Sequence, residues 1–257
     1  MTHRLVGIVT GAAGGIGSAV ALKLASLGAQ LVITDLDAAA LERVAAQHAA
    51  GPGRLLPLAG DLLDAQLPDR LVSTAVEAFG SLTLLVNCSG WLKDHRILEM
   101  PVDTFRRLLD INLVGPMRLV DAAAAAMKMA GRGRIVSLAS RAWLGNFGSS
   151  GYSAAKGGLV GATRSLALAL APFGITVNCI APGFIDTPMS RSLPPHILQR
   201  VIDAIPVGRS GHVDDVSALV AFLAGEDSGY ITGQTILACG GRSISEPIAR
   251  QPKEQTA

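Results

Sequence analysis

Tyr152 and Lys156 are the residues whose types and spacing point most directly to chemistry. They are four apart in a segment of helical character, so both side chains lie on one face of a helix, with Cβ atoms roughly 5–6 Å apart. A free phenol has a pKa near ~10, and a neighbouring ammonium group lowers that value because it stabilises the phenolate. Such a tyrosine could exchange a proton with an alcohol or a ketone near neutral pH. By itself, the same pair is also common on ordinary surface helices.

Ser140 and Asn112 add two polar side chains to this pair. Ser140 ends a strand-like segment just upstream of Tyr152, where its hydroxyl group could hydrogen-bond a reacting oxygen. Asn112 lies inside a helical segment, where asparagine is a mediocre helix former, so we interpret it as retained for its side chain. The predicted catalytic set is Asn112, Ser140, Tyr152 and Lys156.

A glycine-rich turn occurs near the start of the chain. The run 10–17, Thr-Gly-Ala-Ala-Gly-Gly-Ile-Gly, follows an apolar strand-like segment and precedes a helical one. Glycines let the backbone turn sharply and approach a ligand. The N-terminus of the following helix offers unpaired N–H groups and a positive dipole end to phosphates. The run therefore predicts a pyrophosphate site, with a plain tight turn as the alternative.

Asp35 ends the second strand-like segment, about 20 residues after the glycine turn, where a ribose-binding acid is expected. A carboxylate there accepts hydrogen bonds from ribose hydroxyl groups and repels a 2′-phosphate. No arginine or lysine lies in the glycine turn or directly after Asp35, so the sequence favours NAD over NADP as the cofactor. The alternative is that Asp35 or Asp37 caps the helix that starts near Ala38.

Polar turns also end the third and fourth predicted strands. Asp61 follows the third strand, and Asn87, Ser89 and Gly90 end the fourth. The carboxyl ends of parallel strands share one edge of a sheet, where the adenine side of a dinucleotide is expected. Asp, Asn and Gly are also good turn formers, so a purely structural role stays open.

Strand and helix patterns alternate along the chain. The predicted strands, which are short and apolar, cover residues 5–10, 30–34, 55–59, 82–87, 134–138, 176–181 and 235–238. The predicted helices cover residues 15–27, 38–49, 66–79, 102–129, 152–171 and 213–223, with a kink in the fourth near Gly115-Pro116. This alternation predicts an α/β fold, namely a doubly wound, parallel, seven-stranded sheet with helices on both faces (a Rossmann fold) in a single domain.

Residues 1–245 are expected to form this NAD-binding catalytic domain. Residues 188–206 interrupt the alternation with Pro194-Pro195 and mixed polarity. We interpret them as a substrate lid over the carboxyl edge of the sheet, with a simple surface excursion as the alternative. The polar residues 246–257 are expected to form a flexible tail.

Together, these motifs resemble the short-chain dehydrogenase/reductase family. The resemblance covers residues 5–241, and the glycine spacing is similar to that of the compact single-domain branch rather than the epimerase-type branch. The family's usual Asn-Asn-Ala-Gly is here Asn-Cys-Ser-Gly at 87–90, and both replacements are small, so we expect the backbone contacts to survive. The motifs that carry the resemblance are Thr10-Gly11-x-x-x-Gly15-x-Gly17, Asn87-x-x-Gly90, Asn112, Ser140, Tyr152-x-x-x-Lys156 and Pro182-Gly183.

The resemblance implies a role for each catalytic residue. It implies Tyr152 as the acid and base, and Ser140 as the group that stabilises the substrate oxygen. Lys156 would hold the nicotinamide ribose and lower the pKa of the tyrosine, and Asn112 would position a water in a proton relay. The cofactor-binding set given by the motifs and the resemblance together is Gly11, Gly14, Gly15, Ile16, Gly17, Asp35, Leu36, Asp61, Leu62, Asn87, Ser89, Gly90, Tyr152, Lys156, Pro182, Gly183, Ile185 and Thr187.

Substrate contacts are expected from residues beside the catalytic ones. Both tryptophans fall there, which favours an apolar, cyclic or aromatic substrate, although a tryptophan in such a loop can also pack only against a neighbouring helix or subunit. The predicted substrate residues are Trp91, Arg141, Trp143, Leu144, Phe147, Phe184 and Met189. Basic side chains in this region could attract a carboxylate, phosphopantetheine or coenzyme A, or be solvated loop charges; they are Lys93, His95, Arg96, Arg141 and Arg191.

Composition limits the partners of the chain. The net charge of its 257 residues is +2 and the basic residues are scattered, so no nucleic-acid face is expected. The three cysteines and five histidines lack metal-ligand spacing, so we predict no metal site, and the odd cysteine count favours a reducing compartment. Without a membrane-spanning run or a signal-peptide pattern, we expect a cytoplasmic protein with no membrane partner. Similar proteins are usually tetramers, and the apolar helix 152–171 favours a homotetramer.

We therefore predict an oxidoreductase, an NAD-dependent short-chain alcohol dehydrogenase or ketoreductase. It would interconvert a small-molecule secondary alcohol and a ketone by hydride transfer, with Tyr152 as acid and base. One alternative is an NADPH-dependent 3-oxoacyl thioester reductase, which Asp35 disfavours. The other is a non-catalytic nucleotide sensor, which would not need the complete catalytic set.

Overall fold

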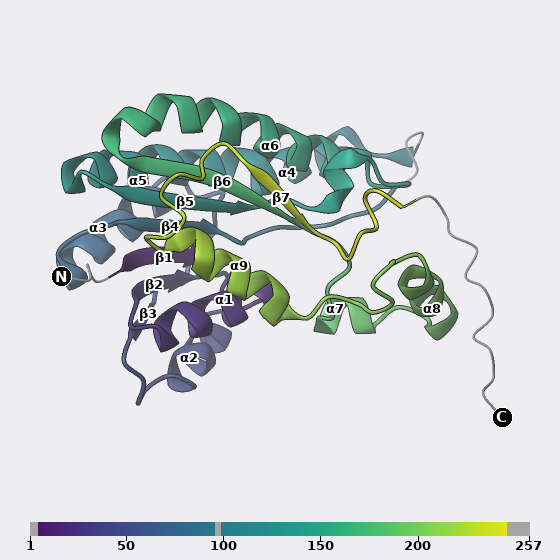
Figure 1. The fold of residues 1–257 in the computed structure, drawn as a ribbon, viewed down its shortest axis with the longest axis horizontal. Coiled ribbons are helices and arrows are strands. Elements are labelled where there is room, and N and C mark those ends of the chain that lie inside the picture. The colour runs from purple at the N-terminus through teal and green to yellow at the C-terminus, as the bar shows by residue number, and fades with distance from the viewer. Residues whose placement is uncertain (1–4, 96–98, 246–257) are drawn as a thin grey trace.

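The computed structural model describes residues 5–95 and 99–245, and it contains a seven-stranded sheet with helices on both faces (Figure 1). The strands lie in the order β3-β2-β1-β4-β5-β6-β7, and all neighbours are parallel. They are β1 Val6–Thr10, β2 Gln30–Thr34, β3 Arg54–Pro57, β4 Leu84–Asn87, β5 Gly133–Leu138, β6 Ile175–Pro182 and β7 Thr235–Ala238. The predicted doubly wound Rossmann fold is confirmed.

The sheet reverses its winding direction at β1. This strand pairs with β2 on one side and with β4 on the other, and the register aligns Thr10 with both Thr34 and Asn87. After β3, the chain crosses back to β4 and then continues outward to β7. In such sheets a crevice opens between the carboxyl ends of the two strands at the reversal. The ends of β1 and β4 therefore mark the expected ligand position.

Side chains that alternate along the buried strands anchor one helical layer on each face. Val9 and Ile33 pack on the face covered by α1, α2 and α9, whereas Ile8 and Val32 pack on the face covered by α3, α5 and α6. Successive residues of a strand point to opposite faces, so a continuous apolar run serves both layers. The helices are α1 Gly15–Ser26, α2 Ala38–Ala46, α3 Leu67–Phe79, α4 Val102–Leu109, α5 Gly115–Ala130, α6 Ser150–Leu170, α7 Pro188–Arg191, α8 Pro195–Asp203 and α9 Val213–Ala224.

The long helix predicted over 102–129 is divided by a π-helical turn. The segment Asp110–Val114 separates α4 from α5, and the Gly115 N–H donates to the carbonyl of Asp110, five residues earlier. Pro116 has no N–H, and its ring crowds the carbonyl four residues before it, so a regular α-helix cannot continue through this point. The helix predicted over 102–129 is therefore interrupted by a widened turn, directly before Gly115-Pro116, near which the sequence predicted a kink.

Residues 188–206 contain two short helices that the sequence pattern did not predict. The helices α7 and α8 lie in this segment, beyond the carboxyl ends of the strands (Figure 1). Pro195 occupies the first turn of α8, where its missing N–H is not needed, so Pro194-Pro195 starts a helix instead of excluding one. Residues 246–257, the predicted tail, lie outside the described part of the chain. No helix of the described part is long and apolar enough to span a membrane.

Candidate active site

The glycine-rich turn between β1 and α1 requires glycine at two positions. Gly11 has a φ of +66°, and a Cβ atom on it would lie 2.7 Å from the backbone nitrogen of Ser89. A Cβ atom on Gly17 would lie 2.1 Å from the carbonyl oxygen of Gly11. The two atoms that these Cβ atoms would clash with, the Ser89 nitrogen and the Gly11 carbonyl oxygen, belong to the backbone and cannot move aside easily. Glycine is therefore what allows β1, α1 and the segment after β4 to meet.

The first turn of α1 has no side-chain cap. The helix begins at Gly15, and its N-cap residue is the exposed Gly14, which has no side chain to offer to the N–H groups of that turn. Thr187, in the segment after β6, lies close by: a Cβ atom on Gly15 would be 3.2 Å from its Cγ2 atom. The side chain of Ile16 packs against the core below. Uncapped N–H groups beside a glycine turn fit the pyrophosphate of a dinucleotide.

Asp35 holds the end of β2 to the glycine turn. Its Oδ2 atom accepts a hydrogen bond from the Ala13 N–H at 3.1 Å, and its Oδ1 atom accepts from the Leu36 N–H at 2.7 Å. The cap of α2 is Asp37, which accepts from the Ala40 N–H at 2.9 Å. The capping alternative is therefore correct for Asp37 and wrong for Asp35. Beside Asp35, Leu36 is 70% exposed, an apolar side chain free to pack against a ligand.

Asp61 and Leu62 follow β3. The Oδ1 atom of Asp61 accepts a hydrogen bond from the Leu63 N–H at 2.9 Å, so this carboxylate shapes its own turn. The side chain of Leu62 is buried and packs in the core with α3 and α5. Of the two, only Asp61 presents an exposed side chain to a cofactor.

The segment after β4 is tied to β1 by Thr10, a residue that our predicted cofactor set omitted. The Thr10 hydroxyl oxygen accepts hydrogen bonds from the N–H groups of Cys88 and Ser89, both at 3.1 Å. Asn87 donates to the Ser137 hydroxyl group at 3.3 Å, and its own Oδ1 atom is buried with no partner among the described residues. A polar residue at the end of a buried strand was the signal that could have identified Thr10.

Gly90 is the point where the cofactor and catalytic sets meet. A Cβ atom on it would lie 3.0 Å from Asn112 Oδ1 and 3.6 Å from Lys156 Nζ. Asn112 is fully buried in the π-helical turn, where its Oδ1 atom accepts from the Trp91 N–H at 3.1 Å. Its amide group donates to the carbonyls of Trp91 and Leu108, at 2.8 and 2.9 Å. The asparagine is thus retained for its side chain, which fixes the segment after β4 against α4.

Lys156 is a buried cation at the carboxyl end of β5. It is 3% exposed, and its Nζ atom donates to the carbonyl of Leu138 at 2.7 Å. Burial lowers its pKa to about 8, because desolvation disfavours the charged amine. The same Nζ atom lies 5.6 Å from the ring centroid of Tyr152. The predicted pair therefore does share one helix face, and it points into the protein rather than into solvent.

Tyr152, in the first turn of α6, is hydrogen-bonded to Ser140. Burial raises the pKa of the phenol; the hydrogen bond with Ser140 opposes the rise, and the negative charge of Asp94 adds to it. In the protein chain by itself the pKa of Tyr152 is therefore raised, whereas the sequence led us to expect a lowered value, because desolvation is the largest cause of the shift. Ser140 is itself held in place, since its Oγ atom accepts from the Ala142 N–H at 3.2 Å.

The segment after β6 is fixed beside the glycine turn by its own backbone. A Cβ atom on Gly183 would lie 2.7 Å from the Cα atom of Cys239, so the ends of β6 and β7 meet closely behind Pro182. Ile185 is buried in the core and can offer only backbone groups to a cofactor. The Thr187 N–H donates to the hydroxyl group of the neighbouring Ser190 at 2.8 Å.

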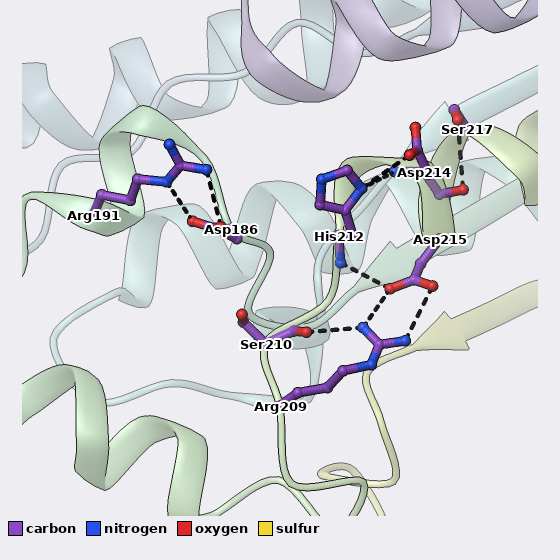
Figure 2. A network of polar contacts seen from close by, with 8 residues as sticks. All are labelled: Asp186, Arg191, Arg209, Ser210, His212, Asp214, Asp215 and Ser217. Carbon is purple, nitrogen blue, oxygen red and sulfur yellow. Dashed lines mark hydrogen bonds and ion pairs between the residues drawn. The ribbon is translucent and has the colours of Figure 1, made fainter.

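A network of ion pairs holds both ends of the segment that contains α7 and α8, and the sequence analysis did not identify it. Figure 2 shows Arg191 donating to both carboxylate oxygens of Asp186, at 2.8 and 3.0 Å, and Arg209 donating to those of Asp215, at 2.7 and 3.2 Å. Asp215 also accepts from the His212 N–H and completes a capping box at the start of α9. The hydrogen bonds from Arg209 and then from His212 lower the pKa of Asp215 to about 2.

The two tryptophans have partners inside the protein. The guanidinium carbon of Arg107 lies 5.5 Å from the ring centroid of Trp91. Trp143 packs in an apolar cluster with Leu113 and Leu237, and its Nε1 atom is buried with no hydrogen-bond partner among the described residues. Packing against neighbouring elements therefore accounts for most of the surface of both rings.

The remaining predicted substrate residues are spread around the site. Leu144 and Phe147 are exposed, the latter 91%. The side chain of Met189, like the whole of Arg96, lies outside the described residues. Phe184 lines a cavity of about 270 Å³ beneath α8, together with Asp186, Ser190, Arg191, Leu198, Ile202 and Ser210.

Comparison with known proteins identifies the family. A family model described as enoyl-(acyl carrier protein) reductase matches residues 11–243. The chain is 39% identical to the (2S)-[(R)-hydroxy(phenyl)methyl]succinyl-CoA dehydrogenase subunit BbsD of Thauera aromatica, over 93% of this chain and 96% of that protein. It is 38% identical to the (3R)-3-hydroxyacyl-CoA dehydrogenase of Canis lupus familiaris, over 91% of this chain and 94% of the relative. The crystal structure of levodione reductase superposes with a TM-score of 0.90 at 30% identity, covering 96% of this chain and 100% of that one.

The chain belongs to the short-chain dehydrogenase/reductase family. It is therefore an oxidoreductase that works with a nicotinamide cofactor, and the glycine turn and the open first turn of α1 fit that cofactor. The four residues that the sequence predicts to be catalytic are Asn112, Ser140, Tyr152 and Lys156.

Proposed function

We propose that this protein is an NAD-dependent alcohol dehydrogenase or ketoreductase that interconverts a secondary alcohol and a ketone. One observation carries the proposal: a hydrogen-bonded Tyr152–Ser140 pair, with Lys156 and Asn112 close to Gly90, lies at the carboxyl edge of the sheet. Bound NAD supplies the hydride acceptor, or NADH the donor. The protein then has to move one proton.

Tyr152 is the proposed acid and base. Its hydroxyl group gives a proton to a ketone oxygen or removes one from an alcohol, while the Ser140 hydroxyl group hydrogen-bonds that same oxygen. Since burial raises the pKa of Tyr152, the phenol is protonated at neutral pH and is ready for reduction. Alcohol oxidation needs positive charge near the phenolate. Lys156, whose Nζ atom lies 5.6 Å from the ring centroid of Tyr152, would supply it together with the oxidised cofactor.

Lys156 is the proposed proton reservoir and ribose ligand. One of its N–H groups is used by the Leu138 carbonyl, so the others are available to ribose hydroxyl groups and to the phenol. Its pKa of about 8 allows it to take up or release a proton near neutral pH. Asn112 keeps the segment after β4 next to this amine, which suits the water relay that the family resemblance implies.

Exchanging Tyr152 for phenylalanine tests the mechanism. Oxidation of NADH and NADPH would be followed against cyclic, aryl and 3-oxoacyl thioester ketones. We expect Tyr152→Phe to lose at least roughly a hundredfold in kcat with NADH binding retained, the usual effect of removing a general acid. Turnover near the wild-type rate would overturn the mechanism. Tyr230→Phe is the matched control, because that tyrosine is fully exposed.

Asp35 supports NAD as the cofactor. The variant Asp35→Asn removes the charge that repels a 2′-phosphate, and it keeps a side-chain oxygen for only one of the two hydrogen bonds that the N–H groups of Ala13 and Leu36 donate. We expect the ratio of kcat/KM for NADH over NADPH to fall about tenfold, equivalent to about 1.4 kcal/mol. Asp37→Asn removes the same charge from the α2 cap and should leave the ratio unchanged. An unchanged ratio in Asp35→Asn would refute the role of Asp35.

A second candidate function is reduction of 3-oxoacyl thioesters. Its support comes from relatives: besides the hydroxyacyl-CoA dehydrogenase, a 3-oxoacyl-[acyl-carrier-protein] reductase of Synechocystis is 36% identical over 92% of this chain. The substrate panel decides between the two candidates, because a thioester reductase would turn over acetoacetyl thioesters far faster than simple cyclic ketones.

Three further features complete the proposal. The segment 188–206 acts as a substrate lid, and its support is the cavity beneath α8 and the ion pairs at its two ends.

The protein forms a homotetramer, favoured by the exposed apolar residues Leu168 on α6 and Met129 on α5; sedimentation of a monomer alone would refute this. The three unpaired cysteines favour the reducing cytoplasm.

A further inference from the structure

Two arginines follow strands at the carboxyl edge of the sheet, the edge that also holds the proposed catalytic pair. Arg141 directly follows Ser140, three residues after the end of β5, and Arg242 lies four residues after the end of β7. The strand between them, β6, pairs with both, and the register keeps the ends of β5, β6 and β7 together. The turn that carries Arg242 packs against Pro206, behind α8.

Neither arginine has a carboxylate partner within residues 5–95 and 99–245. The guanidinium group of Arg141 reaches only the amide oxygen of Asn146, at 3.5 Å. From there, hydrogen bonds lead through Ser149 to Asp94, whose carboxylate is occupied by the Ser149 hydroxyl group. Arg191 and Arg209 differ in this respect, because both are exposed and each is paired with an aspartate.

Both arginines are also partly removed from solvent. The register of β5, β6 and β7 brings the segments that carry the two cations to the same edge of the sheet. Burial lowers the pKa of Arg242, and the positive charge of Arg141 lowers it further. Two adjacent, half-buried guanidinium groups without an anion are unfavourable, because desolvation and repulsion add up. A bound anion would relieve both costs.

We propose that Arg141 and Arg242 together bind an anionic group of the substrate, a carboxylate or a phosphate, beside the Ser140–Tyr152 pair. Guanidinium groups suit these anions because their planar N–H donors match pairs of oxygens. The inference rests on the proposed function and narrows its substrates to ketones and alcohols that carry a negative charge. The Thauera relative is named for a substrate that is itself a succinyl thioester, in which both kinds of anion are present.

Matched substrates separate the two sources of the anion. The pair 3-benzoylpropionate and its methyl ester differs by one carboxylate, and the pair acetoacetyl-phosphopantetheine and acetoacetyl-pantetheine differs by one phosphate. For each pair, kcat/KM would be measured for the wild type, Arg141→Gln and Arg242→Gln. Arg70→Gln on α3 is the control, since it removes an equal charge from an exposed arginine that pairs with Asp64.

We expect the wild type to prefer the charged member of one pair, and each site variant to lose roughly ten- to hundredfold on that member only. A loss of kcat/KM confined to 3-benzoylpropionate identifies a carboxylate as the bound anion. A loss confined to the charged thioester identifies a phosphate. Equal ratios in wild type and variants would overturn the inference while the proposed function stands. Arg141→Lys, which keeps the charge, should recover part of the loss.

Direct binding tests the inference without turnover. Titration calorimetry with glutarate and with coenzyme A should show binding to the wild type that is weakened in Arg141→Gln and retained in Arg70→Gln. If no ketone is turned over but this pattern holds, the proposed function fails and the anion site stands. If neither anion binds the wild type, the inference is wrong.

Discussion

Replacing Lys156 by methionine should change how the stability of the protein depends on pH. Lys156 is 3% exposed, and burial lowers its pKa from 10.5 to about 8. Between these two values the unfolded chain binds more protons than the folded one, so the free energy of unfolding rises with pH. From pH 7 to pH 9, Lys156 contributes about 1.4 kcal/mol to this rise. The folded protein has lost the proton of Lys156 in the pH unit above its pKa, whereas the unfolded chain still holds it. The neutral amine still donates to the Leu138 carbonyl, so the hydrogen bond survives the change.

The assay is urea denaturation at pH 7 and pH 9 with no nucleotide and at one protein concentration, because ligands and assembly shift apparent stability. The measured quantity is the difference in unfolding free energy between wild type and Lys156→Met. We expect the unfolding free energy of the wild type minus that of Lys156→Met to be about 1.4 kcal/mol larger at pH 9 than at pH 7. Lys23→Met, in which an exposed lysine of α1 is lost, should show a difference that does not depend on pH. The same flat response in Lys156→Met would refute the reasoning, since it would mean that Lys156 is not desolvated.

Three further substitutions test the local structure on which the fold depends. Gly17→Ala should cost about 3 kcal/mol and abolish NADH binding, because the new Cβ atom meets the Gly11 carbonyl at 2.1 Å. On α6, a Cβ atom at Gly161 would meet nothing within 4 Å, so Gly161→Ala should raise stability by about 0.5–1 kcal/mol. Melting curves would show whether the two alanine variants change the stability in opposite directions. Asp215→Ala should lose about 1 kcal/mol at pH 7, mainly from the capping box of α9, since the exposed pair with Arg209 adds little. That loss should shrink as the pH falls from about 4 toward 2, because the lowered pKa of Asp215 stabilises only its ionised form; a constant loss would contradict the cap assignment.

Features that depend on local backbone demands were predictable from the sequence. The glycine turn is one, since Gly11 and Gly17 are needed wherever β1, α1 and a neighbouring strand meet. The seven strands are another, because short apolar runs between helices can only be buried in a parallel sheet. The sequence did not predict the π-helical turn or α8, because a proline such as Pro116 or Pro195 is found both where a helix breaks and in the first turn of a helix.

The candidate catalytic residues could also be named from the sequence, but their burial and pKa shifts could not be predicted from it. The spacing of four positions from Tyr152 to Lys156 predicts a shared helix face. Only the fold determines that this face is buried, which raises the pKa of Tyr152 and lowers that of Lys156. Likewise, Asp35 and Asp37 are equivalent as helix caps until the Ala13 N–H, 22 residues away, engages one of them. Desolvation and pairing of charges are set by atoms distant along the chain, so only the tertiary structure decides them.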